Sequence, residues 1–258
     1  MKEGQKLWTR EELLLTINLY AKIPFGKMDH RNKDVQELAS LIGRTLGAVA
    51  RRLANFASLD PIQQSRGIKG LPNTGGLAEE VWKEFYADWD NSFEASEELL
   101  ANSKQITTEN LYDIDYSDII EGQDKQRLVK TRINQYRFRQ IDMANYNSTC
   151  CNTGIKEPQL LIASHITSWS KFKNNRLNPA NGLCLNALHD KAFDNGLLTV
   201  TAEDYTILIS PSLKKKPTLE VQDYFLKYDR QKIKFPKKFM PDPKFLEIHN
   251  EDFRKKLN

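Results

Sequence analysis

Apolar residues recur at helical spacing in three stretches between residues 9 and 60. In each stretch the apolar positions lie three or four residues apart, which places them on one face of a helix. The three inward faces are Leu13, Leu14, Ile17 and Tyr20; Val35, Leu38, Ala39 and Ile42; and Val49, Ala50, Leu53 and Phe56. Thr9, Asn32 and Thr45 stand before them as N-caps, and Glu12 completes a capping box with Thr9. The pattern predicts a three-helix domain within residues 1–75.

A loop and an acidic segment follow this domain. Residues 65–76 contain four glycines and a proline, a composition that disfavours regular structure. From Leu77 to about Ala101, apolar and aromatic residues at helical spacing predict one long amphipathic helix. Residues 102–124 have the composition of a linker. We therefore expect residues 76–124 to form a helical, acidic connector.

The rest of the chain alternates between helical and strand-like patterns. The predicted elements are, in order, a basic helix over 125–146, buried strands over 160–163 and 183–185, a helix capped by Asn186, strands over 197–200, 205–210 and 231–236, and a terminal helix from Asp242-Pro243. Phe138 of the basic helix is expected to pack under the first strand. His165 stands where that strand ends, and His189 lies on the capped helix. The whole chain is predicted to be α+β.

Charge separates along the chain in the same way as the predicted elements. The net charge of the 258 residues is +4, but residues 1–75 carry +5, residues 76–125 carry −11 and residues 126–258 carry +10. Two basic blocks on either side of an acidic one suggest two units that face nucleic acid and a connector that does not. Solvated surface charge is the alternative, but it would not be expected to separate so cleanly.

Cysteine usage and hydropathy point to a cytoplasmic protein. The cysteines are Cys150, Cys151 and Cys184, and an odd number with an adjacent pair is not a disulfide framework. We expect all three to be reduced and structural. No signal peptide and no apolar run of the ~20 residues needed to cross a bilayer is found, so no membrane partner is expected.

The segment around the two histidines resembles the HNH nuclease family, whose fold is called ββα-metal. The resemblance rests on Ser164-His165-Ile166, on Asn181-Gly182-Leu183 and on the stretch from His189 to Asp194, His-Asp-Lys-Ala-Phe-Asp. Their order and their strand and helix context agree with one branch of that family. The resemblance implies a nuclease domain over residues 125–258.

The resemblance also implies roles for these residues. His165 corresponds to the general base that takes a proton from water, and a neutral histidine can do so near pH 7. His189 corresponds to the metal ligand on the helix, and Asn181 to the loop asparagine that braces the strands. An ordinary Asn-Gly turn is the alternative for Asn181. The cofactor implied is one divalent cation, Mg²⁺ or else Mn²⁺.

One position departs from the pattern of the family. Many HNH enzymes have Asp directly before the base, as a further metal ligand, whereas this chain has Ser164. A neutral hydroxyl is a weak ligand, so metal binding is expected to be looser or to use another carboxylate. Asp190 and Asp194 are one helical turn apart and can share a face of the helix. Asp194 can equally serve only to end the helix.

The N-terminal domain resembles a helix-turn-helix with a Myb-like opening, Trp8-Thr9-Arg10-Glu11-Glu12. By that resemblance the third helix recognises DNA. The residues expected on or beside its exposed face are Arg44, Gly47, Ala48, Arg51, Arg52 and Asn55. We expect Arg44, Arg51, Arg52 and Asn55 to bind DNA. A helical bundle that binds another protein is the alternative.

The combined prediction is a metal-dependent DNA endonuclease, with double-stranded DNA as partner and a restriction or phage-defence setting implied by the resemblance. Arg132 and Arg139 on the basic helix are expected to grip phosphates, with a solvated basic face as the alternative. Other functions in view are a DNA-binding regulator with an inactive nuclease fold, a nicking or homing-type nuclease, and an RNase. One site per chain favours a homodimer or two successive nicks for cutting both strands.

Overall fold

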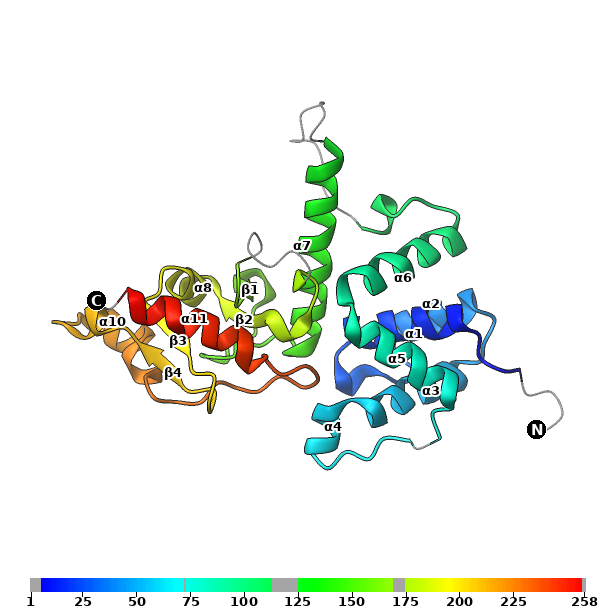
Figure 1. The fold of residues 1–258 in the computed structure, drawn as a ribbon, viewed down its shortest axis with the longest axis horizontal. Helices are drawn as coiled ribbons and strands as arrows, with labels where there is room; N and C mark the ends of the chain where they lie inside the picture. The colour runs from blue at the N-terminus through cyan, green and yellow to red at the C-terminus, as the bar shows by residue number, and fades with distance from the viewer. Residues whose placement is uncertain (1–5, 72, 113–124, 169–174, 257–258) are drawn as a thin grey trace. The chain divides into compact units, whose positions relative to one another are not determined.

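A computed structural model describes residues 6–71, 73–112, 125–168 and 175–256 of the chain (Figure 1). The chain divides into two compact units, residues 1–137 and residues 138–258. The N-terminal unit is helical in its described residues, whereas the C-terminal unit combines helices with short strands. This mixture agrees with the predicted α+β class. Helix α7, Lys125–Asn145, contributes residues to both units.

The first three helices form as their caps and apolar faces predict. They are α1, Arg10–Lys22; α2, Lys33–Leu41; and α3, Leu46–Leu59. Thr9 caps α1 and accepts a hydrogen bond from the Glu12 backbone, while the Glu12 side chain accepts one from the Thr9 backbone, so the predicted capping box is confirmed. Asn32 and Thr45 cap α2 and α3 through their side chains, as predicted.

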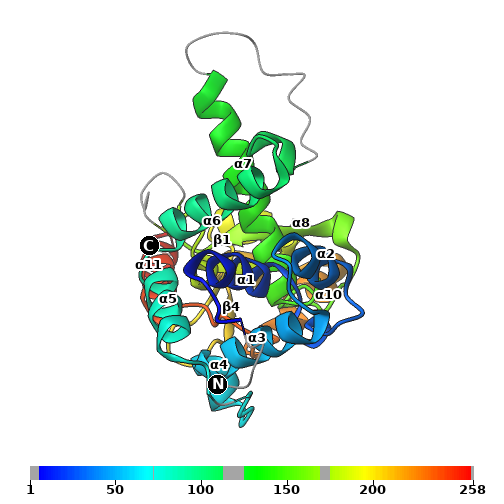
Figure 2. The ribbon, with the colours of Figure 1, turned by 90° about the vertical axis from the view of Figure 1, so that its right-hand side faces the viewer.

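The acidic segment belongs to the N-terminal unit and is not a separate connector. Beyond α4, Pro61–Ser65, the helices α5, Gly76–Ala87, and α6, Trp89–Lys104, both pack against α1 (Figure 2). Contacts between aromatic rings hold α5 to the first helices: Trp82 lies 5.5 Å from both Tyr20 and Phe56, centroid to centroid. The predicted boundary near residue 75 therefore does not match the packing, because the aromatic stripe completes the core of the first unit.

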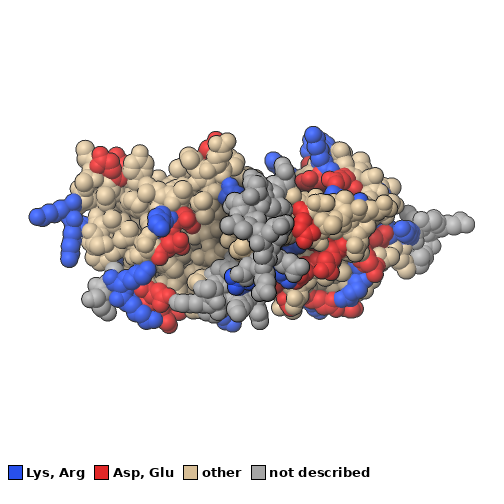
Figure 3. Space-filling view, turned by 90° about the horizontal axis from the view of Figure 1, so that it is seen from above, with Lys and Arg blue, Asp and Glu red and all other residues tan. Residues whose placement is uncertain are grey.

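A second correction concerns the length of that helix. The single helix predicted over residues 77–101 is two helices, because the chain breaks at Asp88, which has φ −146° and caps α6 through its side chain. The predicted linker contains the helical turn η2, Glu109–Leu111. Residues 113–124 of that linker lie outside the described part of the chain. On the face drawn in Figure 3, Asp and Glu side chains are frequent over the N-terminal unit.

A buried ion cluster ties α6 to two other helices of the N-terminal unit. Glu97 of α6 is fully buried and bonds to both Lys22 of α1 and Arg137 of α7. Burial by itself would raise the pKa of Glu97, but the two nearby cations lower it. The carboxylate is therefore ionised, and its charge is balanced inside the protein rather than by water.

The C-terminal unit has the predicted order of strand, strand and helix. β1, Leu161–His165, pairs antiparallel with β2, Gly182–Asn186, and places His165 opposite Gly182 and Ser164 opposite Leu183. α8, Ala187–Asp194, follows at once and is capped by Asn186, as predicted. The turns η3, Pro158–Leu160, and η5, Pro179–Asn181, precede the two strands.

A second small sheet and the last helix cover this motif. β3, Leu198–Val200, pairs antiparallel with β4, Ile207–Ile209, and α11, Pro243–Lys255, packs on β3 (Figure 1). Three short helical elements lie between them, α9 at Pro211–Lys214, α10 at Leu219–Tyr224 and η6 at Leu226–Tyr228. The strand predicted over 231–236 is wrong, since that stretch makes only an isolated bridge between Lys232 and Thr206.

The core of this unit includes the cysteines. Cys150, Cys151 and Cys184 are buried and free, in agreement with the prediction that they are reduced. The Cys150 sulfur accepts a hydrogen bond from the Asn186 backbone at 3.3 Å, next to the cap of α8. The described residues contain no helix that is long and apolar enough to cross a bilayer.

The buried ion cluster gives the first testable prediction. Glu97→Gln removes the charge that Lys22 and Arg137 share, so two buried cations lose their counter-ion. We expect the variant to lose about 3 kcal/mol of unfolding free energy, measured by urea denaturation. Glu94→Gln is the matched control on the same helix, because Glu94 pairs with the exposed Lys130 and should cost less than about 1 kcal/mol. Equal losses in the two variants would contradict this account of the cluster.

Candidate functional site

His165 is held at the end of β1 by a ring stacked on its face. Phe138 of α7 lies nearly parallel to the imidazole, with 3.6 Å between ring centroids and 17° between planes. Gly182, opposite His165 in the register, makes room for this contact. A Cβ atom there would lie 3.0 Å from the Phe138 ring and 2.8 Å from the Asp142 carboxyl group. The prediction that Phe138 packs under the first strand is confirmed.

A hydrogen bond to the backbone decides which ring nitrogen of His165 can act as a base. Nε2 lies 2.9 Å from the backbone oxygen of Arg176. A carbonyl oxygen only accepts, so Nε2 carries the proton and Nδ1 carries the lone pair of the neutral ring. Burial lowers the pKa of His165 to about 4, while the hydrogen bond to Arg176 opposes that change. The imidazole is therefore neutral at pH 7, in the state that a general base requires.

Asn181 holds the chain that follows His165 and the loop that contacts its ring. Its side-chain oxygen accepts hydrogen bonds from the Thr167 backbone at 2.9 Å and from the Thr167 hydroxyl at 3.0 Å, and its backbone oxygen accepts one from Ile166 at 2.9 Å. Its Nδ2 donates to the Asn175 oxygen, next to Arg176. These contacts hold the residues that follow His165 and the loop that supplies its carbonyl partner. The geometry agrees with the bracing role expected for Asn181.

His189 is placed differently from what the resemblance implies. Its side chain is buried, with Nε2 2.6 Å from the Tyr224 backbone oxygen and Nδ1 3.1 Å from Nδ2 of Asn152. Nε2 donates its N–H to the Tyr224 carbonyl oxygen, and the amide of Asn152 donates to the lone pair on Nδ1. Both ring nitrogens therefore have hydrogen-bond partners inside the protein. Burial also lowers the pKa of His189. In this geometry the assignment of His189 as metal ligand is not supported, because no ring nitrogen is left to bind a metal.

The oxygen-bearing side chains expected to bind metal lie close to one another at β1 and α8. Ser164 is buried, and its hydroxyl makes no hydrogen bond of normal geometry with any described residue. It nevertheless lies near enough to the Asp190 carboxyl to lower its pKa, although burial, the larger effect, raises that pKa. Asp194, one turn further along α8, raises it again through repulsion between the two carboxylates. Two neighbouring carboxylates with an unsatisfied hydroxyl form a set of hard oxygen ligands.

This oxygen set fits a magnesium ion better than a transition metal. Mg²⁺ binds through one or two carboxylates and keeps several waters, whereas zinc sites gather three or more protein ligands. Among the described residues, no three His, Cys, Asp or Glu side chains are arranged as a metal cluster. The donors therefore suit a cation that is held in part by water and substrate.

A cleft of about 160 Å³ opens next to the base. One wall is the end of β1 with the residues after it, from His165 to Ser168. A second wall is the C-terminal end of α8, including Asp194, and the third is α11. His165 and Asp194, which are 29 positions apart in the chain, are thus brought to one cleft.

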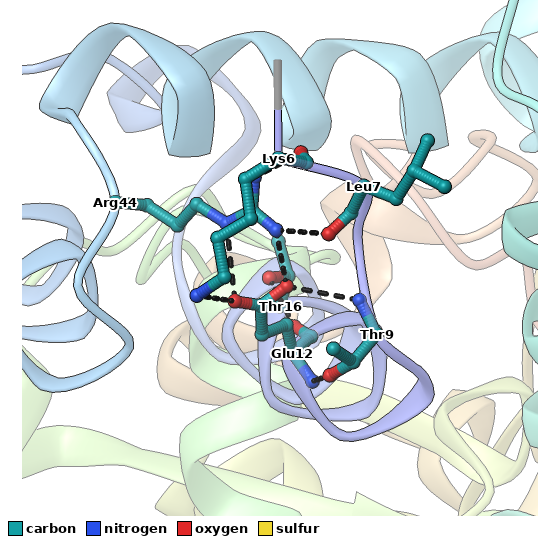
Figure 4. Close-up of polar contacts among 6 residues, drawn as sticks. All are labelled: Lys6, Leu7, Thr9, Glu12, Thr16 and Arg44. Carbon is teal, nitrogen blue, oxygen red and sulfur yellow. Dashed lines mark hydrogen bonds and ion pairs between the residues drawn. The ribbon is translucent and has the colours of Figure 1, made fainter. Parts of the chain in front are cut away.

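Most of the residues expected to bind DNA in the N-terminal unit are used inside the protein. Arg44 bonds to Glu12 at 2.6 Å and to the backbone oxygens of Lys6 and Leu7, and its guanidinium side chain is 8% exposed (Figure 4). Arg44 and Arg52 both lie over the Trp8 ring, 4.7 Å and 4.9 Å from its centroid.

Arg52 and Asn55 also bond to the loop that follows α4. Arg52 donates to the Thr74 backbone oxygen, and Asn55 is buried and donates to the Leu71 oxygen. The expectation that Asn55 lies on the exposed face of α3 is therefore wrong, and the guanidinium of Arg44 is occupied by Glu12. Arg51 is the exposed arginine of this helix.

The two arginines of α7 differ from each other. Arg139 donates to the backbone oxygens of Leu161 at 2.6 Å and Pro158 at 2.8 Å. These two contacts anchor the start of β1, and phosphate binding by Arg139 stays a prediction. Arg132 is half-buried on the part of α7 that belongs to the N-terminal unit.

Three parts of the site were not predicted from the sequence. They are the Arg176 carbonyl, the amide of Asn152 and the wall formed by α11. A backbone carbonyl leaves no trace in the residue type, so the first could not be found. Asn152 follows a cysteine pair in a loop, and α11 carries ordinary amphipathic spacing, so neither carried a signal of its own.

Comparison with known proteins agrees with this geometry. A family model described as HNH endonuclease matches residues 150–201, the segment that contains β1, β2 and α8. No curated protein sequence matches the chain. Residues 150–201 of the chain are therefore similar to an HNH endonuclease domain.

The tautomer and titration of His165 form the second prediction. In spectra of the ¹⁵N-labelled imidazole, the neutral ring should carry its proton on Nε2 and should titrate near pH 4, because burial disfavours the charged form. Phe138→Leu removes the stacked ring and should move the midpoint upward. A midpoint near 6.5 in the folded wild type, or a proton on Nδ1, would contradict the geometry.

Proposed function

We propose that this protein is a metal-dependent DNA endonuclease in which His165 is the general base. The observation that carries the proposal is the hydrogen bond from His165 Nε2 to the Arg176 oxygen, which assigns the lone pair to Nδ1 in a residue that lines an open cleft. The match to the HNH family supports phosphodiester hydrolysis as the reaction. A restriction or phage-defence setting is part of the proposal through the family resemblance.

In this proposal each residue of the site has a separate role in hydrolysis. His165 takes a proton from the attacking water, and the Arg176 carbonyl stabilises the imidazolium that forms by accepting its Nε2 proton in a hydrogen bond. Asn181 keeps this geometry by holding Thr167 and Asn175. Phe138 prevents the ring from turning, because a stacked aromatic ring covers one of its faces.

The divalent cation belongs with the oxygen ligands of α8. We assign it to Asp190 and Asp194, with Ser164 as a neutral oxygen beside them, and Mg²⁺ is the ion that best suits such ligands. When bound, such an ion polarises the phosphoryl oxygen and stabilises the leaving oxygen. Burial and the neighbouring Asp194 both raise the pKa of Asp190. A bound cation would offset both effects, because it stabilises the charged carboxylate.

Double-stranded DNA is the proposed substrate, and the N-terminal unit is proposed to contact it. Arg51 lies exposed on α3, and Leu46 and Gly47 are exposed at the start of the same helix. In this proposal Arg51 carries the contact with DNA, while Arg44 and Arg52 hold the N-terminal segment to the helices. A protein-binding bundle is the competing interpretation. Arg51→Ala in the full chain separates the two, since it should weaken duplex binding at low salt only if the N-terminal unit contacts DNA.

The other functions differ in what they do to a nucleic acid. An inactive regulator binds DNA without cutting it, a nicking enzyme cuts one strand, and an RNase prefers RNA. Incubation of the full chain with plasmid DNA and with RNA, in Mg²⁺, Mn²⁺ or EDTA, distinguishes all of them. We expect linear or nicked DNA in the presence of Mg²⁺ and none in EDTA.

Replacement of the base tests the mechanism. His165→Ala should lower the cleavage rate by about 10²–10⁴-fold, because it removes proton transfer from water, and should leave duplex affinity near that of the wild type. His30→Ala is the control, since His30 is an exposed histidine of the N-terminal unit. Wild-type rates in the His165 variant would remove this residue from the mechanism.

The metal assignment can be tested by comparing two neighbours on α8. Asp190→Asn should raise the Mg²⁺ concentration needed for half-maximal cleavage, because a charged ligand is lost. His189→Gln should leave that concentration unchanged but lower the thermal midpoint, because it disturbs the contacts to Asn152 and Tyr224. The opposite result, with the metal requirement changed only in the His189 variant, would restore His189 as the ligand.

A further inference from the structure

The cleft beside His165 is built in part by a helix outside the matched segment. The family model ends at residue 201, whereas α11 begins at Pro243. Ile248, His249, Asp252, Phe253 and Lys256, on α11 or at its C-terminal cap, line the same cleft as His165 and Asp194. The last helix therefore contributes chemical groups to the site as well as apolar packing.

Lys256 is held in place at this cleft by two contacts. Its aliphatic chain crosses Gly196, where an added Cβ would lie 2.6 Å from the Lys256 Cδ atom. Gly196 also has φ +68°, a backbone conformation that favours glycine. The ammonium group of Lys256 donates to the Asp194 backbone oxygen at 3.3 Å. A long side chain that is already ordered loses less entropy when it binds a ligand.

The charged side chains that line the cleft are two carboxylates and one lysine. The two carboxylates are those of Asp194 and Asp252. Among the residues described as lining the cleft, Lys256 is the one Lys or Arg. Asp252 is offset from outside by Lys255 at 3.4 Å. A positive charge on this wall favours the approach of an anionic phosphodiester, in addition to the divalent cation proposed at Asp190 and Asp194.

The ammonium group has hydrogen-bonding capacity left for a ligand. A lysine carries three N–H donors, and the contact with the Asp194 oxygen uses one of them. Lys256 stands at the end of α11, which forms the third wall of the cleft, and its side chain extends to the C-terminal end of α8. A residue needed only to cap α8 would not have to lie in the cleft. The charge of Lys256 is therefore placed where the backbone of a bound nucleic acid would pass the base.

We propose that Lys256 binds a backbone phosphate of the DNA in the His165 cleft, and so positions the strand for hydrolysis. The inference rests on the proposed function, since it takes the ligand of the cleft to be a phosphodiester. Lys256 acts on the strand through charge and one or two hydrogen bonds, and takes no part in proton transfer. It is a binding residue supplied by the C-terminal helix.

The test uses variants of the full chain and a short fluorescent DNA duplex. Lys256→Met keeps the aliphatic chain over Gly196 but removes the charge, and Lys256→Arg restores the charge. Lys255→Met is the matched control, because Lys255 is the adjacent lysine, is largely exposed and does not line the cleft. Duplex affinity is measured in EDTA over a series of salt concentrations, and cleavage in Mg²⁺ gives kcat and KM separately.

We expect Lys256→Met to reduce the salt dependence of log Kd by about one unit, because one phosphate contact is lost. KM should rise by about tenfold, with a smaller change in kcat, and Lys256→Arg should recover most of the loss. The proposal is overturned if Lys256→Met lowers only the thermal midpoint, which would show a structural cap. It is also overturned if Lys255→Met changes the salt dependence equally, which would show general surface charge.

Failure of the proposed function gives a different result. In that case the wild type neither cleaves the duplex in Mg²⁺ nor binds it at low salt, before any variant is compared. If the wild type cleaves and the Lys256 variants match it in KM and salt dependence, the nuclease stands and the role of Lys256 is wrong.

Discussion

Close packing between α7 and the β1–β2 hairpin is the constraint on which the site depends. Phe138 lies against His165, and Gly182 has no side chain because a Cβ atom would collide with both Phe138 and Asp142. This packing fixes the imidazole in one orientation, so that its Nε2 meets the Arg176 oxygen. The protonation state of His165 then follows, because burial keeps the ring neutral and the Arg176 carbonyl accepts a hydrogen bond from its Nε2 proton.

The same packing leaves a carboxyl group buried in the core. Asp142 is fully buried, neither of its side-chain oxygens has a hydrogen-bond partner among the described residues, and burial raises its pKa well above the ordinary value. Burial therefore favours the protonated form of Asp142, because a buried negative charge without a partner costs free energy. Asp142 contrasts with Glu97 in the N-terminal unit, which is as deeply buried but keeps its charge because Lys22 and Arg137 neutralise it. The two units thus accommodate buried acids in opposite ways.

Arg44 and Arg52 of the N-terminal unit make contacts within that unit. Arg44 and Arg52 both contact the Trp8 ring. Arg44 also pairs with Glu12, the residue that completes the capping box of α1 (Figure 4). These cation–π contacts fix the segment before α1 to the third helix. The net charge counted from the sequence is therefore larger than the charge that a ligand would meet at the surface. An arginine that is paired with an internal carboxylate contributes little to the surface potential. Binding of DNA by this unit would depend on residues such as Arg51 that remain exposed.

The sequence by itself determined the local structure and the order of the catalytic elements. Side-chain caps and apolar spacing act within a few residues, so α1, α2, α3, α8 and α11 begin where Thr9, Asn32, Thr45, Asn186 and Asp242 indicate. The motif around His165 and Asn181 was recognisable because its strand, loop and helix are contiguous along the chain. Tertiary structure alone decided which atoms of those residues are available. The ring nitrogens of His189 are taken by Asn152 and by a carbonyl at Tyr224, 35 residues away, and Lys256 reaches the cleft from the end of the chain. These contacts form because segments that are distant in the sequence pack together. A backbone carbonyl is also the same in every residue type, so the local sequence pattern cannot predict which carbonyl becomes the partner.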